Sequence, residues 1–277
     1  MSELRDDNRA LRNQVAGLER ESSYREGFDA RIELSLTAAA LDNQRVALVA
    51  LPGASSDVVG ATRDSLRAAG ADVPVTVSVE EKWTDPDQEQ VLDQLASQLV
   101  SEGTTLPDGD GYDRGAALLA GALVSAGVTS GEHTPGTPAA TAEPSDGPTD
   151  PQVAALAGLR EAGLIQVEGD ATGKAPLAVL VSGDPMSGDG AEDRNARLVT
   201  IARGIDAAGG GTVVAGTEAS AEGDGLVALI RGDDGAAQNI STVDVANLVS
   251  GRIATVFALV GQAAGSTGAA AGGPSRE

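Results

Sequence analysis

Cysteine is absent from the 277 residues of this chain, and its absence excludes disulfide bonds, thiolate metal sites and cysteine nucleophiles together. Aromatic residues make up only 2% of the sequence, so a core has to be built from valine, leucine, isoleucine and alanine. No apolar run approaches the roughly 20 residues that span a bilayer, and no basic-then-apolar signal peptide opens the chain. We therefore expect the chain as given to be soluble.

Basic residues are also scarce, since lysine and arginine number 19 against 41 aspartates and glutamates, for a formal net charge of −22. A protein that binds nucleic acid has to neutralise phosphates, and one that binds an anionic membrane surface by charge needs basic clusters. This balance excludes nucleic acid as a partner and a charge-driven membrane role.

Groups suited to nucleophilic or metal chemistry are few. His133 is the only histidine and no G-x-S-x-G sequence is present, so a serine triad has no base. No G-x-G-x-x-G is present either, and Gly169–Lys174 has three residues between its glycines where a phosphate loop needs four. Tight copper binding needs clustered Cys, Met or His, whereas His133, Met1 and Met186 are far apart in the sequence. We expect no enzyme activity, no cofactor and no resident metal.

Two alternatives stay open at this point. An enzyme could use Ser55, Asp184 and Asp234, which lie in three loops expected at the carboxyl ends of strands: Pro52–Asp57, Ser182–Asp193 and Gly232–Asn239. The second alternative is weak cation binding at three groups of acidic residues, although such groups are by default interpreted as solvated turns. The groups are Asp108, Asp110 and Asp113; Asp184, Asp189, Glu192 and Asp193; and Asp224, Asp233 and Asp234.

The first 36 residues have the pattern of a coiled coil. Leu4, Leu11 and Leu18 recur every seven residues, and if they occupy d positions, Asn8 and Val15 occupy a positions. Leucine at d with a polar asparagine at a favours a parallel two-stranded coiled coil. The pattern predicts a homodimer through these five residues, and the alternative is a single amphipathic helix packed on its own domain.

Residues 37–264 alternate strands and helices. Continuous apolar runs predict buried strands, and we expect strands at 46–51, 73–79, 164–167, 177–181, 212–215 and 226–230, with a last helix over 241–264. The alternation predicts a mainly parallel α/β sheet, Rossmann-like, with helices on both faces. Residues 128–151, rich in Pro, Thr, Ser and Gly, are predicted to form a flexible loop, and 265–277 a disordered tail.

The order of these features resembles the actinobacterial family named for the copper-transport protein MctB, which also includes the cell-separation protein SteB. The resemblance covers nearly the whole chain except the proline-rich loop, and it rests on order and spacing, because no single motif is strong. The residues that carry it are Leu4–Leu11, Arg45–Val49, Pro52–Ala54, Ala69–Ala71, Asn239–Asp244 and Gly251–Val256.

The resemblance implies an extracytoplasmic protein on the periplasmic side of the inner membrane, anchored by one transmembrane helix before the coiled coil. Met1 and Ser2 stand directly before the heptads, which indicates a chain trimmed to its soluble part. Two functions are implied. The one we favour from the residues is a non-enzymatic dimeric scaffold that controls septal cell-wall hydrolysis with a SteA-like membrane partner and a cell-wall hydrolase; the alternative is copper homeostasis or efflux.

Overall fold

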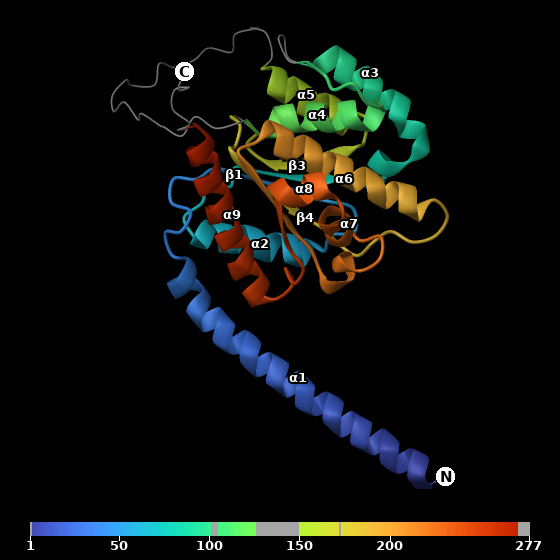
Figure 1. Ribbon diagram of the computed structural model, residues 1–277, viewed down its shortest axis with the longest axis vertical. Coiled ribbons are helices and arrows are strands. Elements are labelled where there is room, and N and C mark those ends of the chain that lie inside the picture. Colours follow the sequence, from blue (N-terminus) through green and yellow to red (C-terminus); the bar gives the residue numbers. More distant parts are fainter. Residues whose placement is uncertain (1, 101–104, 126–149, 172, 271–277) are drawn as a thin grey trace, which may run out of the picture.

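The computed structural model describes residues 2–100, 105–125, 150–171 and 173–270, and the side chains of residues 8–264 within these ranges. The chain has two parts (Figure 1). Helix α1, Ser2–Thr37, projects from the body as a single rod, about 54 Å long at roughly 1.5 Å per residue. The rest forms an α/β domain. The N-terminal helix predicted from the heptads is therefore confirmed, whereas its pairing with a second copy stays a prediction.

The body is built on one six-stranded sheet with the order β3-β2-β1-β4-β5-β6. All neighbouring strands run parallel except β2 and the edge strand β3, which are antiparallel. This is the strand order of a doubly wound dinucleotide-binding sheet with one edge strand reversed, so the mainly parallel α/β prediction is confirmed. The strands are β1 (Val46–Ala50), β2 (Val75–Val79), β3 (Ile165–Gly169), β4 (Leu177–Val181), β5 (Gly211–Ala215) and β6 (Ile240–Val243).

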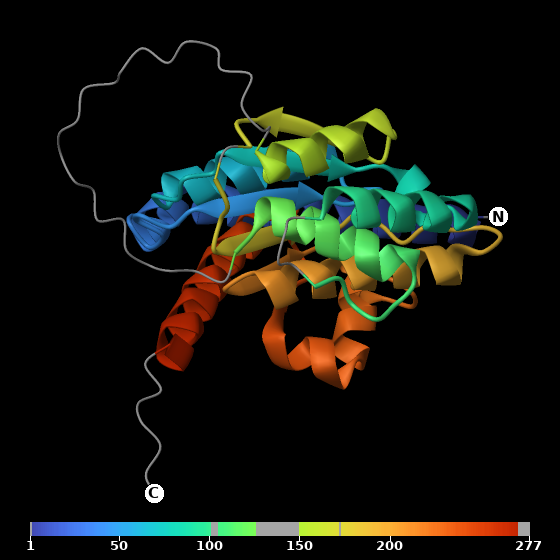
Figure 2. The same ribbon diagram turned by 90° about the horizontal axis from the view of Figure 1, so that it is seen from above.

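Helices cover both faces of the sheet. Figure 1 shows α3, α4, α5 and α6 on one side and α2 and α9 on the other, and Figure 2 shows β3 with α5 at one edge and α7 with α8 at the other. The helices of the body are α2 (Ser56–Ala68), α3 (Glu89–Leu99), α4 (Gly111–Leu123), α5 (Pro151–Glu161), α6 (Ala191–Ala208), α7 (Leu226–Gly232), α8 (Asp234–Asn239) and α9 (Val249–Ala270). Short 3₁₀ turns among the described residues are η1 (Glu81–Thr84), η2 (Pro86–Gln88) and η3 (Glu218–Ala221).

Alternation along the central strands explains why the core has two layers. Every residue of β1, β4 and β5 is buried, as their continuous apolar runs predict. Successive side chains point to opposite faces: Ala47 and Val49 join the core under α3–α6, whereas Val46 and Leu48 join the core under α2 and α9.

Two predictions along this chain are wrong. Leu226–Ile230, predicted as a strand, lies in helix α7, and its buried residues Leu226, Val227 and Ile230 have helical spacing. A short apolar run cannot be assigned to strand or helix by periodicity alone. The helix predicted over 241–264 is in fact strand β6 followed by α9, because the β-branched residues of Ile240–Val243 pair with β5.

The segment boundaries differ in smaller ways from the predicted ones. Of the proline-rich segment, 128–149 lies outside the described residues, and Pro151 is already the first residue of α5. Helix α9 continues to Ala270, beyond the predicted start of the tail, and 271–277 lie outside the described residues. In the described part of the chain, none of the helices combines the length and the apolar composition that crossing a bilayer requires.

Candidate functional site

The turns that follow β1 and β4 lie against each other at the place where a doubly wound sheet binds its ligand. That place lies at the carboxyl ends of β1 and β4, where the strand order reverses. A Cβ atom added to Gly183, just after β4, would lie 1.9 Å from the carbonyl oxygen of Gly53, just after β1. Gly53 itself has a φ of 81°, which favours glycine, and its own added Cβ would lie 3.1 Å from the carbonyl oxygen of Asp184. The two turns are thus in direct backbone contact.

Of the three residues considered for an enzyme, Ser55 and Asp184 have structural partners, and Asp234 does not follow a strand. Ser55 is the N-cap of α2, where its Oγ accepts the backbone N–H of Asp57 at 3.3 Å. The Asp184 carboxylate accepts the hydroxyl of Thr217 at 2.9 Å. Asp234 lies in the first turn of α8, a helix that leads into the amino end of β6, so Gly232–Asn239 does not follow a strand. The sequence reasoning placed Asp234 wrongly because it took α7 for a strand.

Three of the ten residues in these acidic groups, Asp110, Asp113 and Asp233, take part in helix capping. Asp110 and Asp113 form a capping box at the start of α4. Asp233 caps α8 and pairs with Arg203, and the hydrogen bond from Arg203 lowers the pKa of that carboxyl. Among the described residues, no three side chains of His, Cys, Asp or Glu are grouped so that they could hold a metal ion.

Among the described residues, Met186 is the only side chain of the soft kind that copper prefers. The Met186 sulfur lies 3.7 Å from the hydroxyl of Thr84, and the Met186 backbone is held by the side chain of Asn195. His133 and Met1 lie outside the described residues.

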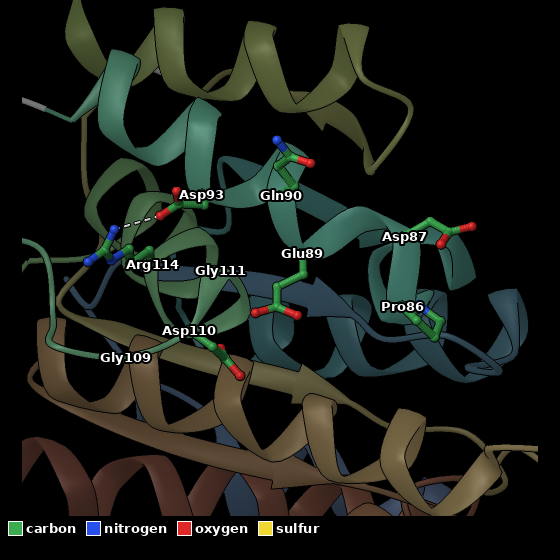
Figure 3. A pocket seen from close by; sticks show the side chains of 9 residues that line it. All are labelled: Pro86, Asp87, Glu89, Gln90, Asp93, Gly109, Asp110, Gly111 and Arg114. Carbon is green, nitrogen blue, oxygen red and sulfur yellow. Dashed lines mark hydrogen bonds and ion pairs between the residues drawn. The ribbon is translucent and has the colours of Figure 1, made fainter.

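One open pocket of 550 Å³ lies between η2, α3 and the start of α4, lined by Pro86, Asp87, Glu89, Gln90, Asp93, Gly109, Asp110, Gly111 and Arg114. Figure 3 shows Arg114 paired with Asp93 at one end and Asp87 at the other, with Glu89 and Asp110 between them. Arg114 and Asp93 are 2.6 Å apart, and Asp110 is engaged in its cap. The pocket is acidic, but its charged side chains already have partners within the chain or remain in solvent, so its lining defines no ligand.

The most distinctive exposed surface is the seam of α1. We call residues 2–22 of α1 the stem and residues 23–37 the junction. In the stem, Leu11, Val15 and Leu18 are 60%, 52% and 59% exposed, and Asn8 is exposed as well. The side chain of Leu4 lies outside the described part. An isolated chain therefore leaves an apolar stripe in water, which is typical of a protein–protein interface.

The junction is fixed to the body by two glutamates. The carboxylate of Glu26 accepts the first backbone N–H of α9, that of Val249, at 3.2 Å, where a helix N-terminus favours negative charge. Glu33 accepts the hydroxyl of Ser65 on α2 at 2.6 Å and lies 3.9 Å from Arg252 on α9. The side chains of Glu33 and Arg252 are only 19% and 15% exposed. The stem consequently has a defined direction relative to the sheet.

Comparison with known proteins identifies the chain's relatives. Its sequence matches the family described as "Copper transport outer membrane protein, MctB" over residues 1–270. The chain belongs to the MctB family.

Among its relatives, the "Copper transporter MctB" of Mycobacterium tuberculosis and that of Mycobacterium bovis are each 28% identical over 279 residues, covering 94% of this chain and 82% of theirs. The Mycobacterium leprae protein of the same name is 28% identical over 225 residues, covering 79% of this chain and 67% of its own length. The resemblance stated from the sequence is confirmed, and these names favour the copper alternative over septal cell-wall hydrolysis.

The exposed seam of the stem and the docked junction are the surface features of α1 that the structure adds to the family assignment. The sequence reasoning found the seam but missed Glu26, Glu33 and Arg252. The sequence does contain a signal for the two glutamates. Glu26 lies eighteen residues after Asn8, and Glu33 eighteen residues after Val15. Because eighteen residues make five helical turns, both glutamates lie on the side of the helix that carries the a positions of the seam.

Proposed function

We propose that this chain is the extracytoplasmic part of a copper-homeostasis component of the cell envelope, in which it assembles the system and does not itself capture the metal. The observation that carries the proposal is the match to the MctB family over residues 1–270. The named copper transporters among its relatives cover nearly the whole chain. A role in septal cell-wall hydrolysis, with a SteA-like partner and a hydrolase, receives no comparable support.

The assembling role follows from ligand chemistry. Copper sites of high affinity use thiolate, thioether or imidazole groups in clusters. The whole sequence has no cysteine, one histidine and two methionines. The many carboxylates can attract cations to the surface by long-range electrostatics, which raises local concentration without building a site. Copper selectivity then has to reside in a partner.

Assembly would begin with the stem. Exposed Leu11, Val15 and Leu18, with Leu4 and Asn8 completing the heptads in the sequence, favour a parallel pair of stems. About three heptads make a marginal coiled coil, so we expect a dimer that dissociates in the micromolar range. A membrane anchor before the stem would raise the local concentration and strengthen the pairing.

The decisive experiment compares cells that lack the gene with cells that carry it. We expect the deletion strain to accumulate more copper and to stop growing at a lower copper concentration. Full-length protein should restore both, and so should His133→Ala, because a lone imidazole is no copper site. The combination Leu11→Ala with Leu18→Ala should fail, whereas the control Asn13→Ala with Arg20→Ala, on the outer face of the stem, should succeed.

Two outcomes would contradict the proposal. Unchanged copper content together with cells that fail to separate would return the septal interpretation to first place. In calorimetric titration of the purified chain with Cu(I) or Cu(II), a submicromolar site that survives His133→Ala would show that the body captures copper itself.

A further inference from the structure

Two aromatic side chains on the junction lie together in water. Tyr24 is 78% exposed and Phe28 is 54% exposed, one helical turn apart on α1. The sequence has only five aromatic residues, and two others, Trp83 and Tyr112, are buried in the core of the body. The fifth, Phe257, is exposed by itself on α9. A chain that is poor in aromatic residues thus places two of them on one exposed turn of a helix.

The two aromatic residues begin a ridge of large side chains along α1. Residues four apart on a helix are surface neighbours and form such ridges. Ile32 and Leu36 follow Phe28 at this spacing, and both are at least partly exposed. We call Tyr24, Phe28, Ile32 and Leu36 the aromatic ridge. A ridge of this kind packs into the groove between the side chains of a second helix, whereas an extended peptide would need a free sheet edge, which α1 does not offer.

The aromatic end of the ridge faces away from both the body and the seam. Nine residues make two and a half helical turns, so residues nine apart lie on opposite sides of a helix. Tyr24 is opposite Glu33, which contacts α2 and α9. Phe28 is opposite Thr37, which is buried. Val15 of the seam is likewise opposite Tyr24. Neither the docking of the junction nor the pairing of two stems therefore covers the two aromatic rings.

Charge is divided between the two sides of the junction. Its three carboxylates lie on the side of the body: Glu26 contacts α9, Glu33 contacts α2 and α9, and the half-buried Asp29 lies between them at helical spacing. Its two arginines, Arg25 and Arg31, are both exposed, and their helical positions place them on either side of the aromatic pair. The outer side of the junction is therefore positive in a chain whose net charge is −22.

Both arginines are available to another molecule. Arg31 forms no ion pair with a residue that the structure describes. Arg25 pairs with Glu21 of the stem at 2.6 Å, but both side chains are more than half exposed, so this pair costs little to rearrange. Aromatic residues and arginine are the residue types enriched at the centres of protein–protein interfaces. The outer side of the junction therefore suits an acidic protein partner.

A second copy of the chain offers no matching surface besides its seam. In the part of the chain that the structure describes, the large exposed apolar side chains outside the seam and the aromatic ridge are Leu34, Val153 and Phe257, which form no row. The helices of the body bury their apolar sides in the chain's own core. The net charge of −22 disfavours anionic lipid as the occupant. These observations favour a helix from a different protein.

We propose that the aromatic ridge docks an acidic amphipathic helix of a different protein, whose apolar stripe covers Tyr24 and Phe28 and whose flanking carboxylates pair with Arg25 and Arg31. This surface lies opposite the seam, so the docking does not require two stems to pair, and it does not depend on the copper role. The two sides of the junction then have separate tasks: one holds the body in place, and the other receives the partner.

Photocrosslinking of the full-length protein in the organism's own cells tests the proposal. A benzophenone amino acid takes the place of Tyr24, which keeps an aromatic side chain there. In the control it takes the place of Asn13, which is exposed on the same side of α1 about three turns earlier. We expect a product with another protein from position 24, at least fivefold above the control. Mass spectrometry of the crosslinked peptide should show apolar residues at helical spacing bordered by aspartate and glutamate.

Charge reversal tests the chemistry of the partner. Arg31→Glu should lower the yield of that product at least threefold, whereas Arg160→Glu, the same change at the exposed end of α5, should leave it unchanged. Phe28→Ala should lower the yield as well. The urea unfolding of the purified Phe28→Ala chain should match that of the parent, because the body does not cover Phe28, and a lost product then cannot be ascribed to misfolding.

Four results in cells would overturn the proposal: a yield at position 24 no higher than at position 13, a product that joins two copies of this chain, a crosslinked peptide without carboxylates, or full yield with Arg31→Glu. Flotation of the purified chain with phosphatidylglycerol vesicles checks for a membrane. We expect no binding, and binding that is lost with Tyr24→Ala and Phe28→Ala together would assign the ridge to lipid and overturn the proposal as well. The copper measurements in cells do not depend on any of these results.

Discussion

Replacing Gly183 by alanine should destabilise the protein strongly, because the new methyl group has no room. Gly183 is buried two residues after the end of β4, and the added Cβ would lie 1.9 Å from the Gly53 oxygen and 2.0 Å from the Gly53 carbonyl carbon. Real Cβ contacts of this kind are not shorter than 3.0 Å. The obstructing atoms are backbone, so one of the two turns has to move by more than 1 Å.

The magnitude follows from overpacking. Forcing a methyl group into a filled site costs about 1–3 kcal/mol, occasionally more, and the overlap with backbone places Gly183→Ala at the upper end, about 3 kcal/mol. Gly60→Ala is the matched control: Gly60 lies inside α2 with nothing within 4 Å of the added Cβ. There alanine should raise the free energy of unfolding by about 0.5–1 kcal/mol, since it restricts the unfolded chain.

Trp83 provides the assay. It is the only tryptophan and is fully buried, so its fluorescence reports the unfolding of the body in urea. We expect the two glycine variants to shift the midpoint in opposite directions. Equal or better stability of Gly183→Ala would refute the backbone contact between the turns.

Three further predictions concern the helix cap, the junction and a half-buried carboxylate. Ser55→Ala should lower the free energy of unfolding by about 1 kcal/mol through loss of the α2 cap, and Ser55→Asp should retain it; urea unfolding checks both, and a loss with Asp equal to that with Ala would argue against capping. Glu33→Ala should cost about 1–3 kcal/mol because it removes the carboxylate beside Arg252, whose side chain is 15% exposed, and the acceptor of the Ser65 hydroxyl, whereas Glu19→Ala on the exposed stem should stay within about 0.5 kcal/mol by thermal unfolding; equal effects would mean that the junction is not docked. Burial raises the pKa of Asp206 above its ordinary 3.8, so the folded state favours the proton and loses stability as pH rises through that raised pKa. Asp206→Asn should therefore raise the melting temperature at pH 7 and have little effect near pH 3, whereas the exposed control Asp189→Asn should change neither; a benefit of Asp206→Asn that is the same at both pH values would contradict this.

Local sequence determined much of the fold. The buried strands β1 and β4 follow from their apolar runs alone, because no surface strand leaves every position apolar. The heptads predicted α1. Family membership could also be predicted from the sequence, because the order and spacing of several weak features indicated it although no single motif was strong.

Other features depended on partners far away in the chain. Leu226–Ile230 became a helix and Ile240–Val243 a strand because β5 offered only one free edge, and β6 occupies it. The contact between the turns after β1 and β4 depends on residues 130 positions apart, Gly53 and Gly183, whose backbones meet only after the strands are ordered. The direction of the stem likewise depends on Glu26 and Glu33 finding α9 and α2. Local patterns fix which segments can be helix or strand, but only packing decides which surfaces are left for a partner.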